Sequence, residues 1–183
     1  MFVYSFLSLT IPAAQSAAAI LPRQTPTQPK LIPIAVGSMS VNTSLIFTPN
    51  DVKANPGDVL QFQFFLTNHT VTQAAGPASP CSPLQDTVPG ALHSGFIPAA
   101  MLNRSNTVGA FDVMVQNTDP MFLYCAQGPH CQLGQVMVVN GKPGDLDAYK
   151  TAAKTASVST PGKEVAGGTV GRIPMANAII PPA

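Results

Sequence analysis

The stretch Tyr124–Asn140, YCAQGPHCQLGQVMVVN, contains no acidic or basic side chain apart from one histidine, yet holds Cys125, His130 and Cys131 within seven positions. The whole 183-residue chain has only three cysteines and three histidines, so the crowding is notable. Apolar residues before Cys125 and after Gln135 predict two strands. The loop between them can fold His130 back toward Cys125. The pattern therefore predicts either a disulfide with a surface histidine or a metal site.

A thiolate next to an imidazole is a ligand pair that suits copper or zinc rather than calcium or magnesium. A trigonal copper site needs a second imidazole, and His69 is available just beyond a predicted core strand. If His69 points inward, strand parity predicts that Asn68 and Thr70 point outward. Such sites carry a weak axial ligand, which is methionine or glutamine. Gln135 is the preferred axial ligand. Met137 is the alternative, because it shares the strand parity of Gln135 but lies about 6–7 Å further along.

Three cysteines in an exported chain leave one over after any single disulfide. If Cys125 binds a metal, Cys81 and Cys131 remain to pair. A second arrangement is a structural zinc site of Cys81, Cys125, Cys131 and His130, which lacks paired C-x2-C spacing and suits an oxidising compartment poorly. A third arrangement pairs Cys125 with Cys81 or Cys131 and binds no metal. The cysteine pattern alone leaves all three open.

Alternating apolar residues predict an all-β fold. Leu60, Phe62, Phe64 and Leu66 fall on one face of a strand, while Gln61 and Gln63 fall on the other. Short strands with turn signals between them predict a Greek-key β-sandwich or barrel over residues 31–141. The segment 74–100 is an irregular excursion within it. Residues 142–183 are expected to form a short helix, capped by Asp145, and a disordered tail, which gives the fold flexible termini.

The N-terminal residues 1–18 are apolar and end in small residues, which predicts a secretory signal peptide, although the usual Lys or Arg is missing. Residues 19–30 form a proline-rich spacer. The apolar run within residues 1–18 is too short, and too interrupted by Pro12, to span a membrane. Three sequons, at Asn42, Asn68 and Asn103, favour a secreted glycoprotein. A charged fraction of 9% and a net charge of +1 argue against a nucleic-acid partner.

The order of His69 in NHTVTQ, Cys81 in SPCSP, and the cluster YCAQGPHCQLGQ resembles the cupredoxin superfamily. FTPNDVKANPGD and the SGF after His93 also match. The similarity is greatest to phytocyanins and to secreted fungal cupredoxin-like proteins. It implies one type 1 (blue) copper held by His69, Cys125 and His130, and a disulfide between Cys81 and Cys131. Gln135 resembles the axial ligand of stellacyanins, which implies a low reduction potential.

Two departures from the family pattern bear on the packing and the site. Many fungal relatives have an axial methionine where this chain has Gln135. The tryptophan usual in the strand before the cysteine is replaced by Phe122 or Leu123. We expect the second change to affect packing more than metal binding.

The sequence thus predicts a secreted, monomeric copper protein that transfers one electron to an unknown redox partner and is not itself an enzyme. An alternative is an extracellular module that binds a cell-wall component and in which copper is absent or incidental. His93 is expected to be an exposed loop residue outside the ligand set. Ser94 beside it lacks the G-x-S-x-G frame of a hydrolase nucleophile.

Overall fold

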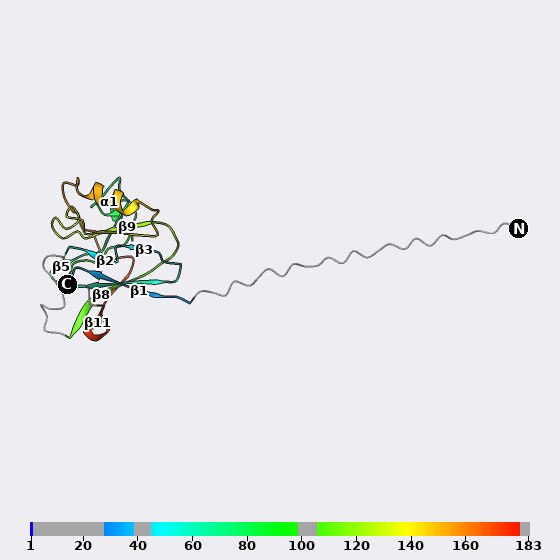
Figure 1. Ribbon diagram of the computed structural model, residues 1–183, viewed down its shortest axis with the longest axis horizontal. Helices are drawn as coiled ribbons and strands as arrows, with labels where there is room; N and C mark the ends of the chain where they lie inside the picture. The colour runs from blue at the N-terminus through cyan, green and yellow to red at the C-terminus, as the bar shows by residue number, and fades with distance from the viewer. Residues whose placement is uncertain (2–27, 39–44, 99–105, 180–183) are drawn as a thin grey trace.

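A computed structural model describes residue 1 and residues 28–38, 45–98 and 106–179. Within them the chain folds into two packed β-sheets (Figure 1). The larger sheet has the order β11-β8-β4-β1-β2, the smaller β3-β10-β9-β6, and β5 pairs with β7. The strands are β1 (Leu31–Val36), β2 (Phe47–Thr48), β3 (Asp51–Val52), β4 (Val59–Phe64), β5 (Asn68–His69), β6 (Thr72–Ala74), β7 (Ile97–Pro98), β8 (Thr107–Met114), β9 (Met121–Tyr124), β10 (Val136–Val139) and β11 (Thr169–Pro174). The helical elements are η2 (Leu84–Asp86), α1 (Asp145–Ala153) and η4 (Met175–Asn177).

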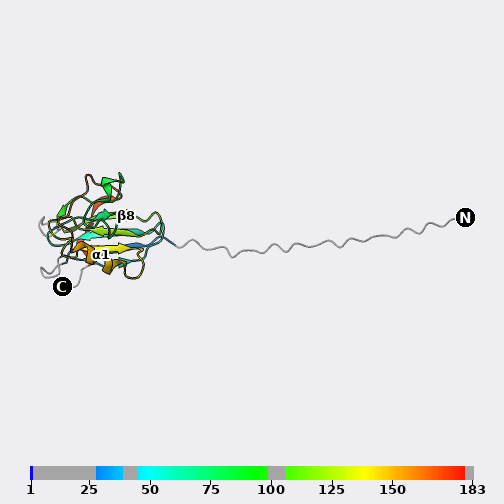
Figure 2. The ribbon, with the colours of Figure 1, turned by 90° about the horizontal axis from the view of Figure 1, so that it is seen from above.

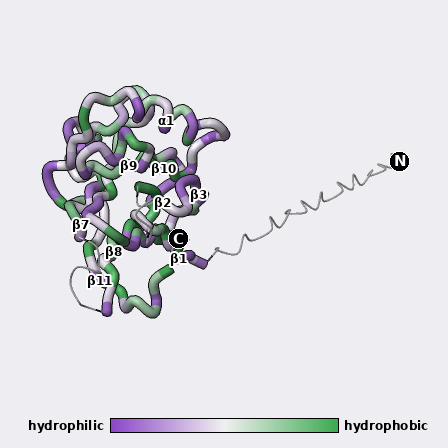
Figure 3. Tube along the Cα trace, turned by 60° about the vertical axis from the view of Figure 1, so that its left-hand side comes forward, coloured by the Kyte–Doolittle hydropathy of each residue, from purple (hydrophilic) through white to green (hydrophobic). Residues whose placement is uncertain are grey.

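The main core lies between the two sheets. Leu60, Phe62 and Phe64 of β4 are fully buried and pack in one cluster with Phe111 of β8 and Leu123 of β9. The predicted strand and its core face are therefore confirmed for Leu60, Phe62 and Phe64, whereas Leu66 follows the end of β4 and is half-buried. Hydrophobic stretches recur along the strands of the interior (Figure 3). Burying these large side chains is the main force that holds the sheets together.

The opposite face of β4 is buried as well, which the alternation did not predict. Gln63 is 1% exposed, donates to Gln61 Oε1 at 3.0 Å and accepts the backbone N–H of Ile179 at 2.8 Å. Nearby, Phe65 and Val108 form a small apolar cluster against residues of the C-terminal segment. The glutamine amides are tolerated there because they are hydrogen-bonded.

The structure differs from the prediction of a disordered tail after the short helix, because residues 169–177 form a strand and a 3-10 turn packed on the domain predicted to end at residue 141. Strand β11 pairs antiparallel with β8 and forms the edge of the larger sheet (Figure 1). Small residues permit this approach, since a Cβ on Gly168 would lie 2.6 Å from the carbonyl oxygen of Asp112. The small residues, prolines and glycines of the C-terminal segment had predicted that it would be mobile. The free edge of β8 instead gives its backbone hydrogen-bonding partners.

Helix α1 is present as predicted and covers the outer face of the smaller sheet. Tyr149 and Ala153 are buried in one cluster with Val136 and Val138 of β10. All four residues of β10 are therefore buried, two on each face. Figure 2 shows the helix on one side of the strands. Asp145 does not cap it.

The residue that does occupy the N-cap is Gly144, in the left-handed region at φ 91°. Asp145 is the first helical residue, and its carboxylate accepts the N–H of Lys142 at 2.7 Å.

The irregular excursion after β6 is fixed at two points. A disulfide joins Cys81 to Cys131, fifty residues apart. The buried Gln85 donates to Ala91 O at 2.7 Å and to Glu164 O at 3.0 Å, and accepts the N–H of Lys163 at 2.7 Å. The excursion is thus tied both to the loop before β10 and to the C-terminal segment.

Several predictions from the sequence fall outside the described residues. These are the signal peptide 1–18, most of the spacer 19–30, and the sequons at Asn42 and Asn103. Among the described residues, no helix has the length and apolar character required to cross a membrane.

Candidate metal centre

The structure brings His69, Cys125 and His130 together at one end of the sandwich, with one ligand atom of each within 4.8 Å of the others. The sulfur of Cys125 lies 3.7 Å from Nδ1 of His69 and 3.4 Å from Nδ1 of His130. His69 ends β5, Cys125 follows β9, and His130 lies in the loop before β10. Two imidazole nitrogens and one sulfur therefore converge from three separate segments.

A hydrogen bond on the side of the ring away from Cys125 fixes the orientation of His69. Its Nε2 lies 2.7 Å from the carbonyl oxygen of Leu66, so this nitrogen carries the proton and donates, and Nδ1 presents its lone pair to the cluster. The ring fits because residue 37 is glycine. A Cβ on Gly37, at φ 82°, would lie 2.6 Å from Nε2 of His69 and 2.5 Å from the carbonyl oxygen of Phe65.

Gln135 contributes an oxygen to the same cluster. Its Oε1 lies 3.1 Å from Nδ1 of His69, and its Nε2 donates to Ile46 O at 3.3 Å, which sets the orientation of the amide. Met137 is fully buried in the main core cluster. Between the two axial candidates, the structure thus places Gln135 at the cluster.

The environment of His69 favours a cation beside it. A neutral imidazole has one N–H, yet this ring faces two acceptor oxygens, Leu66 O and Gln135 Oε1. Burial lowers the pKa of His69 to about 4, so a second ring proton is absent at neutral pH. The lone pairs of Nδ1 and Oε1 therefore face each other across 3.1 Å, and a bound metal ion would satisfy both.

Burial also sets the protonation of the other two residues. It raises the pKa of the Cys125 thiol to about 11 and lowers the pKa of His130. The sulfur consequently keeps its proton until a cation displaces it, because only the thiolate binds a metal strongly. The N–H of Thr70 lies 3.4 Å from the sulfur and can stabilise the negative charge that results.

The disulfide decides between the three cysteine arrangements. Cys81 and Cys131 are bonded to each other, and Cys125 is free and buried. A zinc site using all three cysteines is therefore excluded, as is a disulfide to Cys125. Since Cys131 follows His130 directly, the bridge also anchors the loop that carries this ligand. The loop reaches the surface, where Pro129 is exposed and His130 is half-buried.

Three residues near the cluster lie differently from expectation. His93 is 3% exposed rather than a surface residue, because its backbone bridges to Thr72 and Ala166. Thr70 is fully buried rather than outward, and its hydroxyl accepts the N–H of Ala126 at 2.8 Å. Asn68, a predicted glycosylation site, is half-buried, and its Nδ2 donates to Gln127 Oε1 at 3.3 Å. Little in the sequence signalled this burial, because Thr70 and Thr72 in HTVT are polar although both are fully buried.

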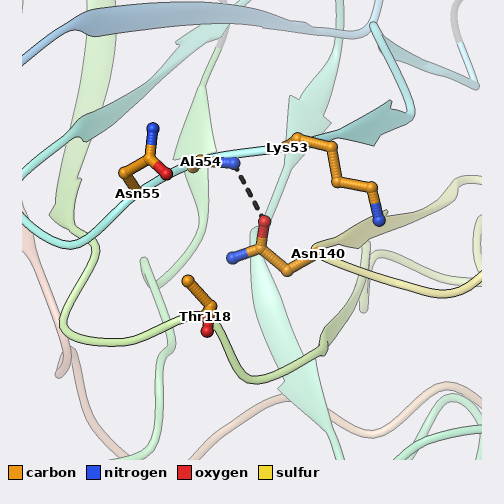
Figure 4. Close-up of a pocket in the computed structure, with 5 residues that line it drawn as sticks. All are labelled: Lys53, Ala54, Asn55, Thr118 and Asn140. Carbon is orange, nitrogen blue, oxygen red and sulfur yellow. Dashed lines mark hydrogen bonds between the residues drawn. The ribbon is translucent and has the colours of Figure 1, made fainter.

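A concave feature beside the end of β10 is separate from this cluster. A pocket of about 340 Å³ is lined by Lys53, Ala54, Asn55, Thr118 and Asn140 (Figure 4). There the N–H of Ala54 donates to Asn140 Oδ1 at 2.9 Å. Asn140 follows the end of β10, whereas Gln135 precedes its start. The pocket and the cluster thus lie at opposite ends of that strand.

Two curated proteins are similar in sequence to part of this chain. No protein-family model matches the chain. It is 35% identical over 115 residues to a probable GPI-anchored cupredoxin of Arthroderma benhamiae, covering 61% of this chain and 54% of that protein. It is 33% identical over 129 residues to an extracellular serine-rich protein of the same organism, covering 69% and 48%. The chain spans about half the length of these curated relatives.

Solved structures overlap with the chain more loosely. Oxidized plastocyanin from Dryopteris crassirhizoma has a TM-score of 0.41 at 14% identity, covering 60% of this chain and 99% of that one. Native pseudoazurin from Hyphomicrobium denitrificans has a TM-score of 0.40 at 20% identity, covering 64% and 81%.

Two packed sheets with a His-Cys-His cluster at one end define a cupredoxin-like protein with a candidate metal centre. The chain is also similar in sequence to a curated protein that bears the name cupredoxin, over 54% of the length of that protein. The predicted resemblance to the cupredoxin superfamily, and the predicted β-sandwich, are confirmed.

Proposed function

We propose that the chain binds one copper ion at His69, Cys125 and His130, with Gln135 as a weak fourth ligand, and that it serves as an extracellular one-electron carrier. The observation that carries the proposal is the convergence of two Nδ1 atoms, one thiol sulfur and one amide oxygen at one end of the sandwich. Soft sulfur with imidazole and a weak axial oxygen is the donor set of a type 1 copper site. Bound there, copper would supply a couple between Cu(I) and Cu(II).

The protein's own contribution is a rigid site. His69 is held by Leu66, Gln135 by Ile46, and the His130 loop by the adjacent disulfide. A site whose ligands are fixed before the electron arrives reorganises little when the charge changes, which favours electron transfer over bond-making chemistry. His130 is the half-buried ligand nearest to solvent, so it is the natural contact for a redox partner.

An extracellular location is part of the proposal. The matched relatives bear the names GPI-anchored and extracellular, and a disulfide fits an oxidising compartment. The predicted signal peptide 1–18 is consistent with export. Sequencing the N-terminus of protein collected from the medium of a secretory host would test this, and retention of residues 1–18 would contradict it.

Metal content and the visible spectrum of protein from a copper-replete secretory host test the metal assignment. We expect one copper per chain and an intense thiolate-to-copper absorption. Cys125→Ser should abolish that absorption. The matched control is the double variant Cys81→Ser with Cys131→Ser, which should keep it whenever the protein folds. A wild-type protein without the absorption would instead favour the alternative function, an extracellular interaction module on the same fold.

A further inference from the structure

The bend between β4 and β5 contains a residue in an unfavourable backbone conformation. Thr67 has a φ of 69°, in the left-handed region. A β-branched side chain is a genuine outlier there, because its Cβ substituents crowd the backbone. Such a conformation costs free energy and persists only where the surrounding contacts compensate for it, and residues of this kind cluster at functional sites. The contacts of Thr67 therefore indicate what the conformation achieves.

Thr67 contacts a ligand of the candidate metal centre directly. It lies two residues before His69, and its Oγ1 lies 3.0 Å from Nε2 of that ring. The carbonyl oxygen of Leu66 lies 2.7 Å from the same nitrogen. A carbonyl oxygen can only accept, so Nε2 carries the proton and shares it between the two oxygens. Because Thr67 is exposed, its own hydroxyl proton is free to donate to solvent.

The backbone of Thr67 also sets the direction of the Leu66 carbonyl. That carbonyl belongs to the peptide plane between Leu66 and Thr67, and φ of Thr67 is the rotation of this plane relative to the chain that follows. His69 is fixed in the following chain by the pairing of β5 with β7. If φ of Thr67 became negative, the plane would rotate and the carbonyl oxygen would leave Nε2. One unfavourable torsion angle thus places both acceptor oxygens.

The hydroxyl distinguishes threonine from the other residues that could stand at position 67. Glycine would adopt a positive φ freely but has no side chain that reaches the ring. Valine has the shape of threonine and the same steric cost, but no hydroxyl that offsets this cost. The hydrogen bond between Thr67 Oγ1 and His69 Nε2 therefore stabilises the left-handed backbone and holds the imidazole at the same time.

We propose that Thr67 is a positioning residue for the metal centre: its left-handed backbone and its hydroxyl together place two acceptor oxygens at Nε2 of His69, so that Nδ1 stays free of a proton and faces the bound ion. The inference deepens the proposed copper function and rests on it for the effect on affinity. Partners of the far nitrogen of a metal-ligating histidine fix its tautomer and ring orientation, and their mutation lowers metal affinity roughly 10- to 100-fold.

The test compares Thr67→Val with Thr67→Ser in the full-length protein. Thr67→Val keeps the branched shape and removes the hydroxyl, and it should lower the affinity for Cu(I), measured by competition with a coloured chelator, about tenfold. Thr67→Ser keeps the hydroxyl and should retain the wild-type affinity. Thr151→Val on α1 is the matched control, because it also removes an exposed threonine hydroxyl, which donates to Asp147 O at 2.8 Å. It should leave the affinity unchanged.

A second readout needs no copper. Nitrogen NMR of the His69 ring in metal-free protein should show the proton on Nε2 in the wild type and in Thr67→Ser, and a mixture of the two tautomers in Thr67→Val. A proton on Nδ1 in the wild type overturns the proposal, as does a wild-type result for Thr67→Val in either measurement. An equal loss of affinity in Thr67→Ser or in Thr151→Val overturns it as well.

Failure of the proposed function would look different from failure of this inference. A wild-type protein that binds no copper would refute the copper function. The NMR spectra of the metal-free variants would still decide whether Thr67 holds the proton of His69 on Nε2.

Discussion

The segments Tyr124–Asn140 and 142–179 are neighbours in the chain and differ in what gives them structure. The first contains its own chemistry: a thiol, an imidazole and an amide at fixed spacing beside a disulfide cysteine. The second is small, polar and punctuated by glycine, and its order comes from contacts with β8, Gln85 and His93. The comparison teaches that several donor atoms of a site can be encoded in one short segment, whereas their completion and enclosure depend on residues far away in the sequence.

The largest expected effect tests the first segment. Removing the disulfide with Cys81→Ser and Cys131→Ser should lower the free energy of unfolding by about 4 kcal/mol, because the bridge closes a loop of fifty residues that is otherwise free in the unfolded chain. Urea denaturation measures the loss. Cys125→Ser keeps the disulfide, so its free energy of unfolding should fall much less. Equal losses in the two variants would show that the disulfide is not the main source of stability in this region.

The next effect tests the second segment. Gly168→Val should prevent β11 from docking, since the added atoms collide with the Asp112 carbonyl and the Phe111 ring, at a cost of about 3 kcal/mol. Gly171→Val, within β11, is the matched control, because nothing lies within 4 Å of its Cβ position. Hydrogen exchange of the β8 amides would report the loss of pairing. Similar protection in both variants would contradict the assigned role of β11.

A smaller effect is expected where the second segment meets the excursion after β6. Gln85→Leu leaves the carbonyls of Ala91 and Glu164 without their donor and should cost about 2 kcal/mol. Gln116→Leu changes an exposed amide in the same way and should be nearly neutral. Thermal unfolding compares the two, and a neutral Gln85→Leu would mean that the C-terminal segment docks without this clamp.

The smallest effect lies outside both segments and depends on pH. Backbone N–H groups of Asn55 and Lys30 donate to the Asp58 carboxylate and lower its pKa below the usual value. A carboxyl with a depressed pKa in the folded state stabilises the protein above its unfolded pKa of about 4, and this stability is lost as pH falls through the folded value. Asp58→Asn should therefore flatten the acid limb of a stability profile. An unchanged limb would exclude Asp58 as its source.

The parts of the molecule that follow from periodicity and spacing were predictable. The alternation of Leu60, Phe62 and Phe64 indicated a core strand, and the Cys-x4-His spacing indicated that Cys125 and His130 could meet. The pairing of Cys81 with Cys131 came from the family resemblance, since the cysteine count alone allowed other arrangements. The choice of Gln135 over Met137 followed from strand rise, which puts only the nearer side chain at the end of the sheet.

What could not be predicted depends on contacts between residues far apart in sequence. Burial of Gln63 and His93 requires the C-terminal segment, which has no hydrophobic periodicity of its own. Parity assigned Thr70 to the outside, but it is a rule for one face of one sheet and fails where a strand is covered on both sides. Polar residues in such places are satisfied by partners that no local pattern reveals.

The glycine at the end of β1 limits how portable the centre is. Gly37 is remote in sequence from the cluster, yet any side chain there would displace His69 from the hydrogen bond that aims its Nδ1. Grafting the loop of Cys125, His130 and Gln135 onto another β-sandwich would therefore transfer the donor atoms without the geometry. A transplant therefore also has to include the turn after β1, which contributes no ligand atom but leaves the space that the His69 ring occupies.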